Sequence, residues 1–401
     1  MSRRIALLYV LLAAALSAAL AQTLASHTGI KAQRTNSRKT LKKYERMKQM
    51  VGKIDAARLP LDAHVKPDTG AAHNKDVNHV VMAAAMNLQT SVRKVNMFAG
   101  TLRKTGYDGD IVVAILPGTQ VDVVKAFHKY KCIVYTIKVF CSGQKSDTVC
   151  SFAENDKNQF SLAMIRFYLY EFWAIKYSEA TLMMLSDFSD VLFQSNPFTY
   201  RPYDWQPPTA HLAVFLEHHP SKVIERCIFN GGWIRSCYGD EALSRVGTNT
   251  VSCSGTTMGV RDAIVVYTHL MTQQLNPTVR YGINTTVTSN KGCLSLGMDQ
   301  GLHNYLLYSG QLETYMDVKV FQQGEGPVNT IGAFRIGPRG MFTFDLTTWK
   351  IMRGVKNQKN VTFHNWNGMK SPAVHQYDRF YNADLGPNDY DNFECAQGLL
   401  T

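Results

Sequence analysis

Apolar segments that alternate with helical patterns fill the first half of the chain. Residues 79–84, 111–116 and 132–139 each have the length of a strand, and residues 91–104 and 121–130 between them have helical spacing. Strands that are apolar on both faces and alternate with helices are typical of a parallel sheet with helices on both faces. The sequence therefore predicts an α/β domain.

A fourth apolar segment, residues 182–185, ends at two carboxylates, Asp187 and Asp190. An aromatic-rich pattern at residues 160–177 predicts a long helix before it. In an open α/β sheet, ligands bind outside the carboxyl ends of the strands. Two acids at that edge repel each other, and a divalent cation that also binds phosphate oxygens removes the repulsion. The alternative is that both acids cap the following turn and face water.

The second half of the chain has a less regular pattern. It predicts strands at residues 211–216 and 318–321 and helices at residues 261–274 and 299–308. Segments that contain glycine, tryptophan and cysteine separate these elements. We expect this half to supply loops and packed segments that flank the sheet.

Polar side chains with possible chemistry occur in several segments of the second half. Residues 252–259 are small and contain glycine, which lets the backbone approach a ligand closely, although a tight turn explains them equally well. Asp299 opens a helix and is either functional or a cap. His375 follows a short apolar segment and is either a ligand or structural, with His364 as a rival ligand. Lys370 offers a cation that reaches a phosphate.

The N-terminus has the pattern of a targeting segment. Arg3 and Arg4 precede an apolar run at residues 5–21, and residues 19–21 have the small-x-small pattern of a cleavage site. The run has the length of a short membrane span. We therefore expect residues 1–25 to be a signal anchor or a signal peptide. The domain then lies in the Golgi or ER lumen as a single-pass type II membrane protein, or is secreted if the segment is cleaved.

Positive charge concentrates before the domain. The chain has a formal net charge of +12, and residues 1–53 account for +10 of it, with eleven basic side chains and one acidic side chain. The remainder is nearly neutral and has no basic stripe, which argues against a nucleic-acid partner.

Residues 26–77 are polar and basic and predict a stem or linker before a domain at residues 78–401. Within the stem, Leu41, Tyr44 and Met47 belong to an apolar series with helical spacing. A partly helical, solvated tether is the favoured interpretation, and contact with a membrane surface is the alternative.

Eight cysteines fit an oxidising compartment. No pair has C-x-x-C spacing, which argues against a zinc site. Two groups are close enough in sequence for local bridges, with the connectivity left open: Cys132, Cys141 and Cys150, and Cys227, Cys237 and Cys253. The sequons at Asn284 and Asn360 are compatible with glycosylation in the lumen.

The order of these segments resembles the GT-A glycosyltransferases, which use nucleotide-diphospho-sugars. The likeness is closest to plant and algal proteins with an Asp-x-x-Asp-Val-x-Phe-Gln-x-x-Pro-Phe motif, and more distant to glycogenin-like enzymes. It covers roughly residues 79–385. The segments with the resemblance are Arg166-Phe167, Ser186–Phe198, Cys253–Gly259, Asp299–Tyr305 and Val374–Arg379.

The resemblance implies a Rossmann-type, mostly parallel sheet and a metal site. Asp187 and Asp190 match the motif that holds Mn²⁺ or Mg²⁺ and approaches the ribose and diphosphate of the donor. His375 matches a late metal ligand, and an imidazole with carboxylates suits Mn²⁺ better than Ca²⁺. The usual motif is Asp-x-Asp, and two residues separate the acids here. Which Asp binds the metal directly therefore stays open.

The resemblance also implies roles on the donor and acceptor sides. Arg166 matches a basic position near the donor diphosphate, and Lys370, which the resemblance does not include, is a further candidate to bind it. Gly255 matches a loop that faces the transferred sugar. Asp299 and Gln300 match the helix that faces the sugar and acceptor, so they are the catalytic candidates, with Asp299 as a base or as a holder of the donor sugar.

The implied activity is a metal-dependent hexosyl or pentosyl transfer. A sugar moves from a nucleotide-diphosphate donor to a glycan or glycoprotein acceptor in the secretory pathway, with inversion or retention left open. One alternative is an inactive GT-A-like module that binds a glycan or nucleotide. Another is a metal phosphohydrolase, which needs further acids or histidines at the strand ends.

Overall fold

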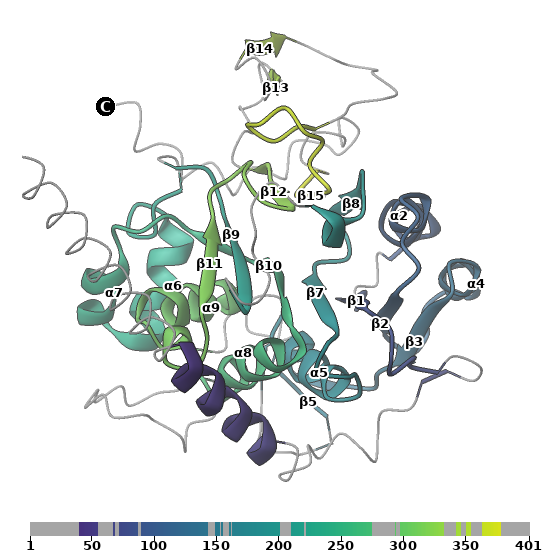
Figure 1. Ribbon diagram of the computed structural model, residues 1–401, viewed down its shortest axis with the longest axis horizontal. Helices are drawn as coiled ribbons and strands as arrows, with labels where there is room; N and C mark the ends of the chain where they lie inside the picture. The colour runs from purple at the N-terminus through teal and green to yellow at the C-terminus, as the bar shows by residue number, and fades with distance from the viewer. Residues whose placement is uncertain are drawn as a thin grey trace, which may run out of the picture.

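The computed structural model describes residues 40–54, 67–68, 72–86, 90–142, 149–152, 154, 160–161, 163–200, 210–219, 222–274, 293, 297–332, 342–345, 350–353 and 363–377 (Figure 1). The predicted targeting segment, most of the stem and both sequons lie outside these residues. Among the described residues, no helix is both long and apolar enough to cross a membrane.

A seven-stranded sheet with the order β11-β9-β10-β7-β1-β2-β3 forms the centre of the domain (Figure 1). Its strands are β1 (His79–Ala84), β2 (Asp110–Ile115), β3 (Cys132–Thr136), β7 (Leu182–Ser186), β9 (Leu212–Leu216), β10 (Ser252–Val260) and β11 (Val318–Phe321). Only β10 runs antiparallel to its neighbours within this sheet. The prediction of a mostly parallel α/β sheet is confirmed, and six of the seven strands end at one carboxyl edge.

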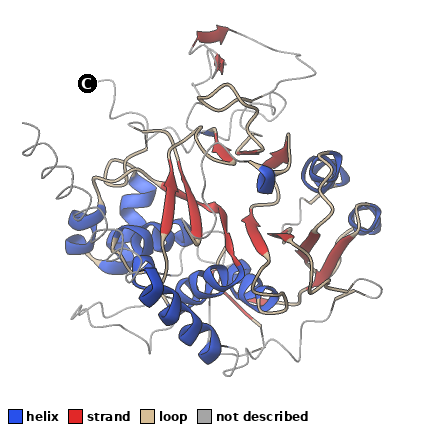
Figure 2. Cartoon of the chain, viewed as in Figure 1, coloured by secondary structure: helices blue, strands red, loops and turns tan. Residues whose placement is uncertain are grey.

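Helices cover both faces of the sheet (Figure 2). Along β1, Val80 and Met82 belong to one core cluster, while Val81 and Ala83 belong to the other. The helices are α2 (Val92–Val95), α3 (Thr101–Lys104), α4 (Val121–Lys129), α5 (Ile165–Ala174), α6 (Ile228–Tyr238), α7 (Asp240–Val246), α8 (Arg261–Gln273) and α9 (Met298–Tyr308), with a π-helix at Asn96–Gly100 and 3-10 helices at Pro197–Thr199 and Leu312–Thr314. Burial of alternate side chains on opposite faces explains the continuous apolar runs.

Small sheets flank the central one. They are β4 (Phe140–Ser142), β5 (Val149–Ser151) and β6 (Phe160–Ser161); β8 (Val191–Phe193), β12 (Val328–Thr330) and β15 (Ala373–His375); and β13 (Phe342–Asp345) with β14 (Lys350–Arg353). The helix expected at residues 160–177 is therefore shorter, because residues 160–161 pair with β5 and α5 begins only at Ile165. Residues 252–259, for which a loop facing a ligand and a tight turn were equally good predictions, form strand β10.

Residues 40–54 of the expected stem form a helix that packs on the domain, drawn in purple in Figure 1. Met47, Val51 and Ile54 are buried in the same core cluster as α5 and α8. Lys48 binds the buried Asp262 at 2.8 Å. The apolar series in this segment therefore packs against protein, and this part of the chain is not a solvated tether.

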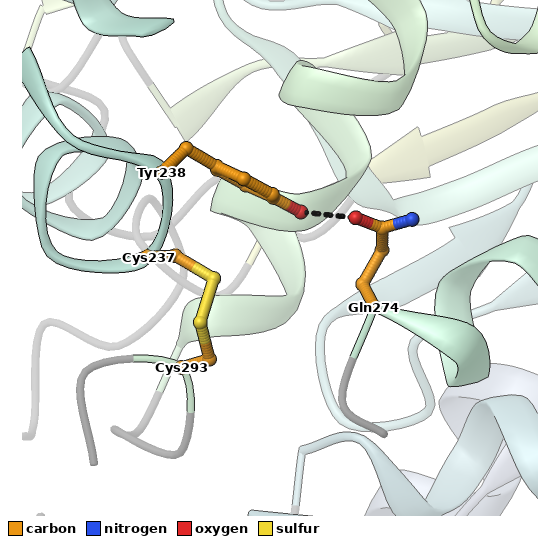
Figure 3. Close-up of a disulfide and its surroundings, with 4 residues drawn as sticks. All are labelled: Cys237, Tyr238, Gln274 and Cys293. Atoms are coloured by element: carbon orange, nitrogen blue, oxygen red, sulfur yellow. Dashed lines mark hydrogen bonds between the residues drawn. A yellow bond between two sulfur atoms is a disulfide. The ribbon is translucent and has the colours of Figure 1, made fainter. Parts of the chain in front are cut away.

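Two disulfides join described residues, as expected for an oxidising compartment. Cys141–Cys150 links the paired strands β4 and β5. Cys237–Cys293 joins the end of α6 to a residue that lies 56 positions later, and Tyr238 beside it donates to Gln274 Oε1 at 2.8 Å (Figure 3). Cys132 and Cys253 are free and buried. Cys237 thus bridges outside its local group.

Candidate metal centre

The pairing of two short strands brings the late histidine to the acidic pair. Asp187 directly follows β7 at the carboxyl edge, and Asp190 directly precedes β8. Strand β15 pairs antiparallel with β8, so that His375 lies opposite Val191. The backbone N–H of Gln376 also donates to the Asp190 carbonyl at 2.7 Å. Backbone pairing therefore fixes the place of His375 across a separation of more than 180 residues.

The three side chains offer ligand atoms to one point. Nε2 of His375 lies 3.3 Å from Asp187 Oδ2 and 3.6 Å from Asp190 Oδ2. One ligand atom from each residue lies within 4.8 Å of the other two. His375 is 1% exposed, and its Nε2 is buried without a hydrogen-bond partner in the described part of the chain. An imidazole nitrogen and two carboxylates that converge in this way form a donor set that fits Mn²⁺ or Mg²⁺.

The other ring nitrogen of His375 has two neighbours that orient the ring. Nδ1 lies 3.5 Å from Cys253 Sγ and 3.5 Å from Thr330 Oγ1. Such contacts on the second nitrogen fix the tautomer and orientation of a metal-binding histidine. Burial lowers the pKa of His375. Nearby Cys253, Asp190 and Asp187 raise it by more than burial lowers it, so the pKa lies well above its ordinary value.

Arg166 joins the candidate metal centre to α9. Its guanidinium binds Asp187 through Nη1 and Asp299 through Nη2. The Ser254 hydroxyl donates to the same Asp299 carboxylate at 2.7 Å. Burial raises the pKa of Asp187, but Arg166 and His375 more than offset this and hold it below its usual range. Arg166, predicted to lie near a donor diphosphate, thus lies directly against the acid expected to bind the metal.

Gly255 gives Asp187 and His375 room to meet. A Cβ atom on Gly255 would lie 2.4 Å from Asp187 Oδ2 and 2.6 Å from His375 Cε1. The Asp187 backbone N–H also donates to the Gly255 carbonyl at 2.6 Å. The glycine lies in β10 rather than in a loop, and it allows close contact between candidate metal ligands.

Asp299 and Gln300 make different contacts at the start of α9. Asp299 is 4% exposed and is held by Arg166 and Ser254. The Gln300 side chain donates to Asn230 Oδ1 at 3.1 Å and to Glu217 Oε1 at 3.5 Å. The two catalytic candidates therefore belong to adjoining networks at the carboxyl edge.

Glu217 was not identified from the sequence as a candidate site residue. It follows β9 as Asp187 follows β7, and it is 4% exposed. Because β9 and β7 are both antiparallel to β10, the two acids lie at the same edge of the sheet. An acid directly after a buried strand was the available signal.

The rival residues lie apart from this arrangement. Lys370 is exposed and forms a backbone bridge with His364. The potential metal group contains His375 and not His364. None of the contacts that join Arg166, Asp187, Asp299 and His375 among the described residues includes Lys370.

The comparisons with known proteins give no family. No protein-family model matches the chain, and no curated protein matches it significantly. The argument for function therefore rests on the geometry of the site and on the sequence resemblance described above.

Proposed function

We propose that the chain is a metal-dependent GT-A-type glycosyltransferase, with a nucleotide-diphospho-sugar as donor. The observation behind the proposal is that Asp187, Asp190 and His375 meet at the carboxyl edge of a mostly parallel sheet. This edge is where open α/β sheets bind their ligands. The sequence resemblance independently selects the same three residues.

Asp187, Asp190 and His375 would hold Mn²⁺ or Mg²⁺ in this mechanism. The bound ion supplies positive charge that stabilises the negative charge developing on a leaving diphosphate. Arg166 keeps Asp187 in place through its ion pair, and Thr330 and Cys253 orient the His375 ring. The ligands are thus held in position before the donor arrives, which lowers the cost of organising the site.

Polar groups on the other side of Arg166 would bind the sugar and the acceptor. Asp299 is fixed by Arg166 and Ser254, which suits a group that orients a sugar hydroxyl. Gln300 lies beside it and contacts Glu217, so these amide and carboxylate groups form a second, buried polar network at the same edge. Glu217 therefore joins Asp299 as a candidate to accept the proton of the acceptor hydroxyl.

The proposal places the domain in the Golgi or ER lumen. The two disulfides support an oxidising compartment. The N-terminal segment would act there as a type II anchor, or as a signal peptide whose cleavage releases the protein.

Thermal unfolding of the full chain with nucleotide diphosphates tests the proposal. At least one of UDP, GDP, ADP and CDP should raise the unfolding midpoint with Mn²⁺ and not without it, because a ligand that binds only the folded state stabilises it. The matching nucleotide sugar should then be hydrolysed or transferred. Binding without any turnover would favour the inactive module, and no stabilisation by any of the four would contradict the proposal.

A further inference from the structure

A cavity of about 380 Å³ lies at the ends of β9 and β11, apart from the metal ligands. Its lining residues are His218, His219, Gln322, Gln323, Glu325 and Trp366. This volume is within the range of small-molecule sites, which is about 300–1,000 Å³.

The order of strands places the cavity on one side of the metal centre. Strands β9 and β11 lie on one side of β10 and β7, and strands β1, β2 and β3 lie on the other (Figure 1). The proposed transferase needs sites for two substrates. If the nucleotide occupies the β1–β3 side, as in open α/β nucleotide folds, the cavity is left for the second substrate.

The chain segments on both sides of the cavity also carry residues of the proposed active site. His218 directly follows Glu217, which accepts a hydrogen bond from Gln300 at 3.5 Å. Trp366 lies on the segment 363–377, which continues through β15 to His375. A ligand in the cavity would therefore contact chain segments that also carry Glu217 and His375.

Trp366 is fixed by the backbone and still partly open to solvent. Its indole Nε1 donates to the Gln323 carbonyl, and its backbone N–H donates to the Gly324 carbonyl at 2.9 Å. Gly324 has a φ of +75°, and a Cβ there would lie 2.6 Å from Trp366 Nε1. Trp366 is 36% exposed. The indole is thus held in one orientation by a turn that requires glycine.

The lining chemistry fits a carbohydrate better than a phosphate or a lipid. Among the described residues that line the cavity, none is Lys or Arg, which are the usual partners of phosphate. Trp366 is the one large apolar side chain in that lining. Amide, imidazole and carboxylate groups bind hydroxyls, and Gln323 Oε1 is buried with no partner among described residues. The C–H groups of a sugar ring pack favourably on an aromatic face.

We infer that this cavity binds a sugar ring of the acceptor, with Trp366 as the stacking surface, so that the acceptor is a glycan. This inference rests on the proposed transferase function, because that function supplies the need for an acceptor. The sequence is compatible with either a glycan or a protein as acceptor, and this inference selects a carbohydrate.

Saturation-transfer NMR on the full chain tests sugar binding directly. The probes are methyl glycosides of glucose, galactose, mannose, xylose, arabinose and N-acetylglucosamine, with a Ser- and Thr-containing peptide in parallel. At least one glycoside should bind without Mn²⁺ or nucleotide, and Trp366→Ala should weaken it roughly ten-fold. Met369→Ala is the matched control, since Met369 is an exposed apolar residue on the same turn but does not line the cavity.

A second variant separates loss of binding from loss of folding. Gln322 is exposed, and its backbone rather than its side chain contacts Glu325, so Gln322→Ala should keep the turn and weaken the sugar roughly three-fold. Equal sugar binding by wild type and both variants, or binding of the peptide alone, overturns the inference while Mn²⁺-dependent nucleotide binding stands. If the chain binds sugar through Trp366 but binds no nucleotide, the result supports sugar binding in the cavity and overturns only the proposed transferase function.

Discussion

Gly255 lies so close to Asp187 that any side chain at this position would force the candidate metal ligands to move. A Cβ on Gly255 would lie 2.4 Å from Asp187 Oδ2, well inside van der Waals contact. Strand β10 approaches Asp187 here because it pairs with β7, with Thr256 opposite Ser186. The geometry of the candidate metal site therefore depends on a backbone position as well as on the three side chains.

Gly255→Ala should weaken Mn²⁺ binding about 10- to 100-fold, because both Asp187 and His375 must move away from the new methyl group. It should also destabilise the fold by about 1–3 kcal/mol through overpacking. Isothermal titration with Mn²⁺ and urea unfolding measure the two effects. Gly232→Ala in α6 is the control, since no atom lies within 4 Å of its Cβ position. Unchanged Mn²⁺ affinity in Gly255→Ala would contradict the prediction.

Asp187→Asn and Asp190→Asn should each lower Mn²⁺ affinity by at least about 100-fold, since each removes an anionic ligand. Asp187→Asn should also lower the free energy of unfolding, by about 2–3 kcal/mol, because it breaks the ion pair with the buried Arg166. Titration of Mn²⁺ and chemical unfolding check both results. Asp240→Asn is the control, because Asp240 is 84% exposed. Mn²⁺ binding that survives in both variants would rule out this site.

His303 should make the protein less stable in acid. Burial, together with Arg166, lowers its pKa from 6.5 to about 3. The unfolded chain binds the proton more tightly, so the stability from a neutral His303 is present above pH 6.5 and is lost as the pH falls toward 3. Between pH 7 and pH 5 the loss is about 2 kcal/mol.

The comparison with His303→Gln isolates this contribution. The variant loses the contacts of His303 with Tyr267 and Ser252, so it should be less stable than wild type at pH 7. Between pH 7 and pH 5 the variant should lose less free energy of unfolding than wild type does. Urea unfolding at both pH values measures this difference. Identical pH dependence in the two proteins would show that His303 does not titrate as described.

Lys48→Ala should loosen the helix of residues 40–54. Lys48 binds Asp262, whose side chain is 4% exposed, and its loss leaves that carboxylate with Arg261 at 2.9 Å. We expect a loss of about 1–2 kcal/mol and faster amide exchange in this helix, with Lys53→Ala at an exposed position as the control. Lys48 also lowers the pKa of Glu179, so this part of the effect is present at neutral pH and disappears in acid.

The sheet was predictable because burial on both faces leaves a plain signal in sequence. Strands β1 and β2 are apolar at nearly every position, and the structure places alternate residues in two separate cores. Strand β10 was missed for the opposite reason. Its residues Ser252–Gly259 are mostly small or polar, so they lack the continuous apolar run that marks a buried strand, and the fold holds them through contacts such as the Ser252 N–H donating to Asn304 Oδ1 at 2.8 Å.

Local sequence pattern could not predict that His375 lies beside Asp187 and Asp190. This arrangement depends on the register of β15 against β8, which joins segments more than 180 residues apart, so only the family resemblance pointed to it. Glu217 had a local signal, as an acid after a buried strand, and was overlooked. The amphipathic pattern of residues 40–54 showed an apolar stripe, but the shape of the domain surface decides that the stripe packs on protein.

Anomalous diffraction from a crystal of the full chain soaked in Mn²⁺ tests the central claim most directly. The account predicts one strong peak at bonding distance from His375 Nε2 and from a carboxylate oxygen of Asp187 or Asp190, and its loss in Asp190→Asn. A peak at another place, or none at these residues, would contradict a metal-dependent transferase centred on them.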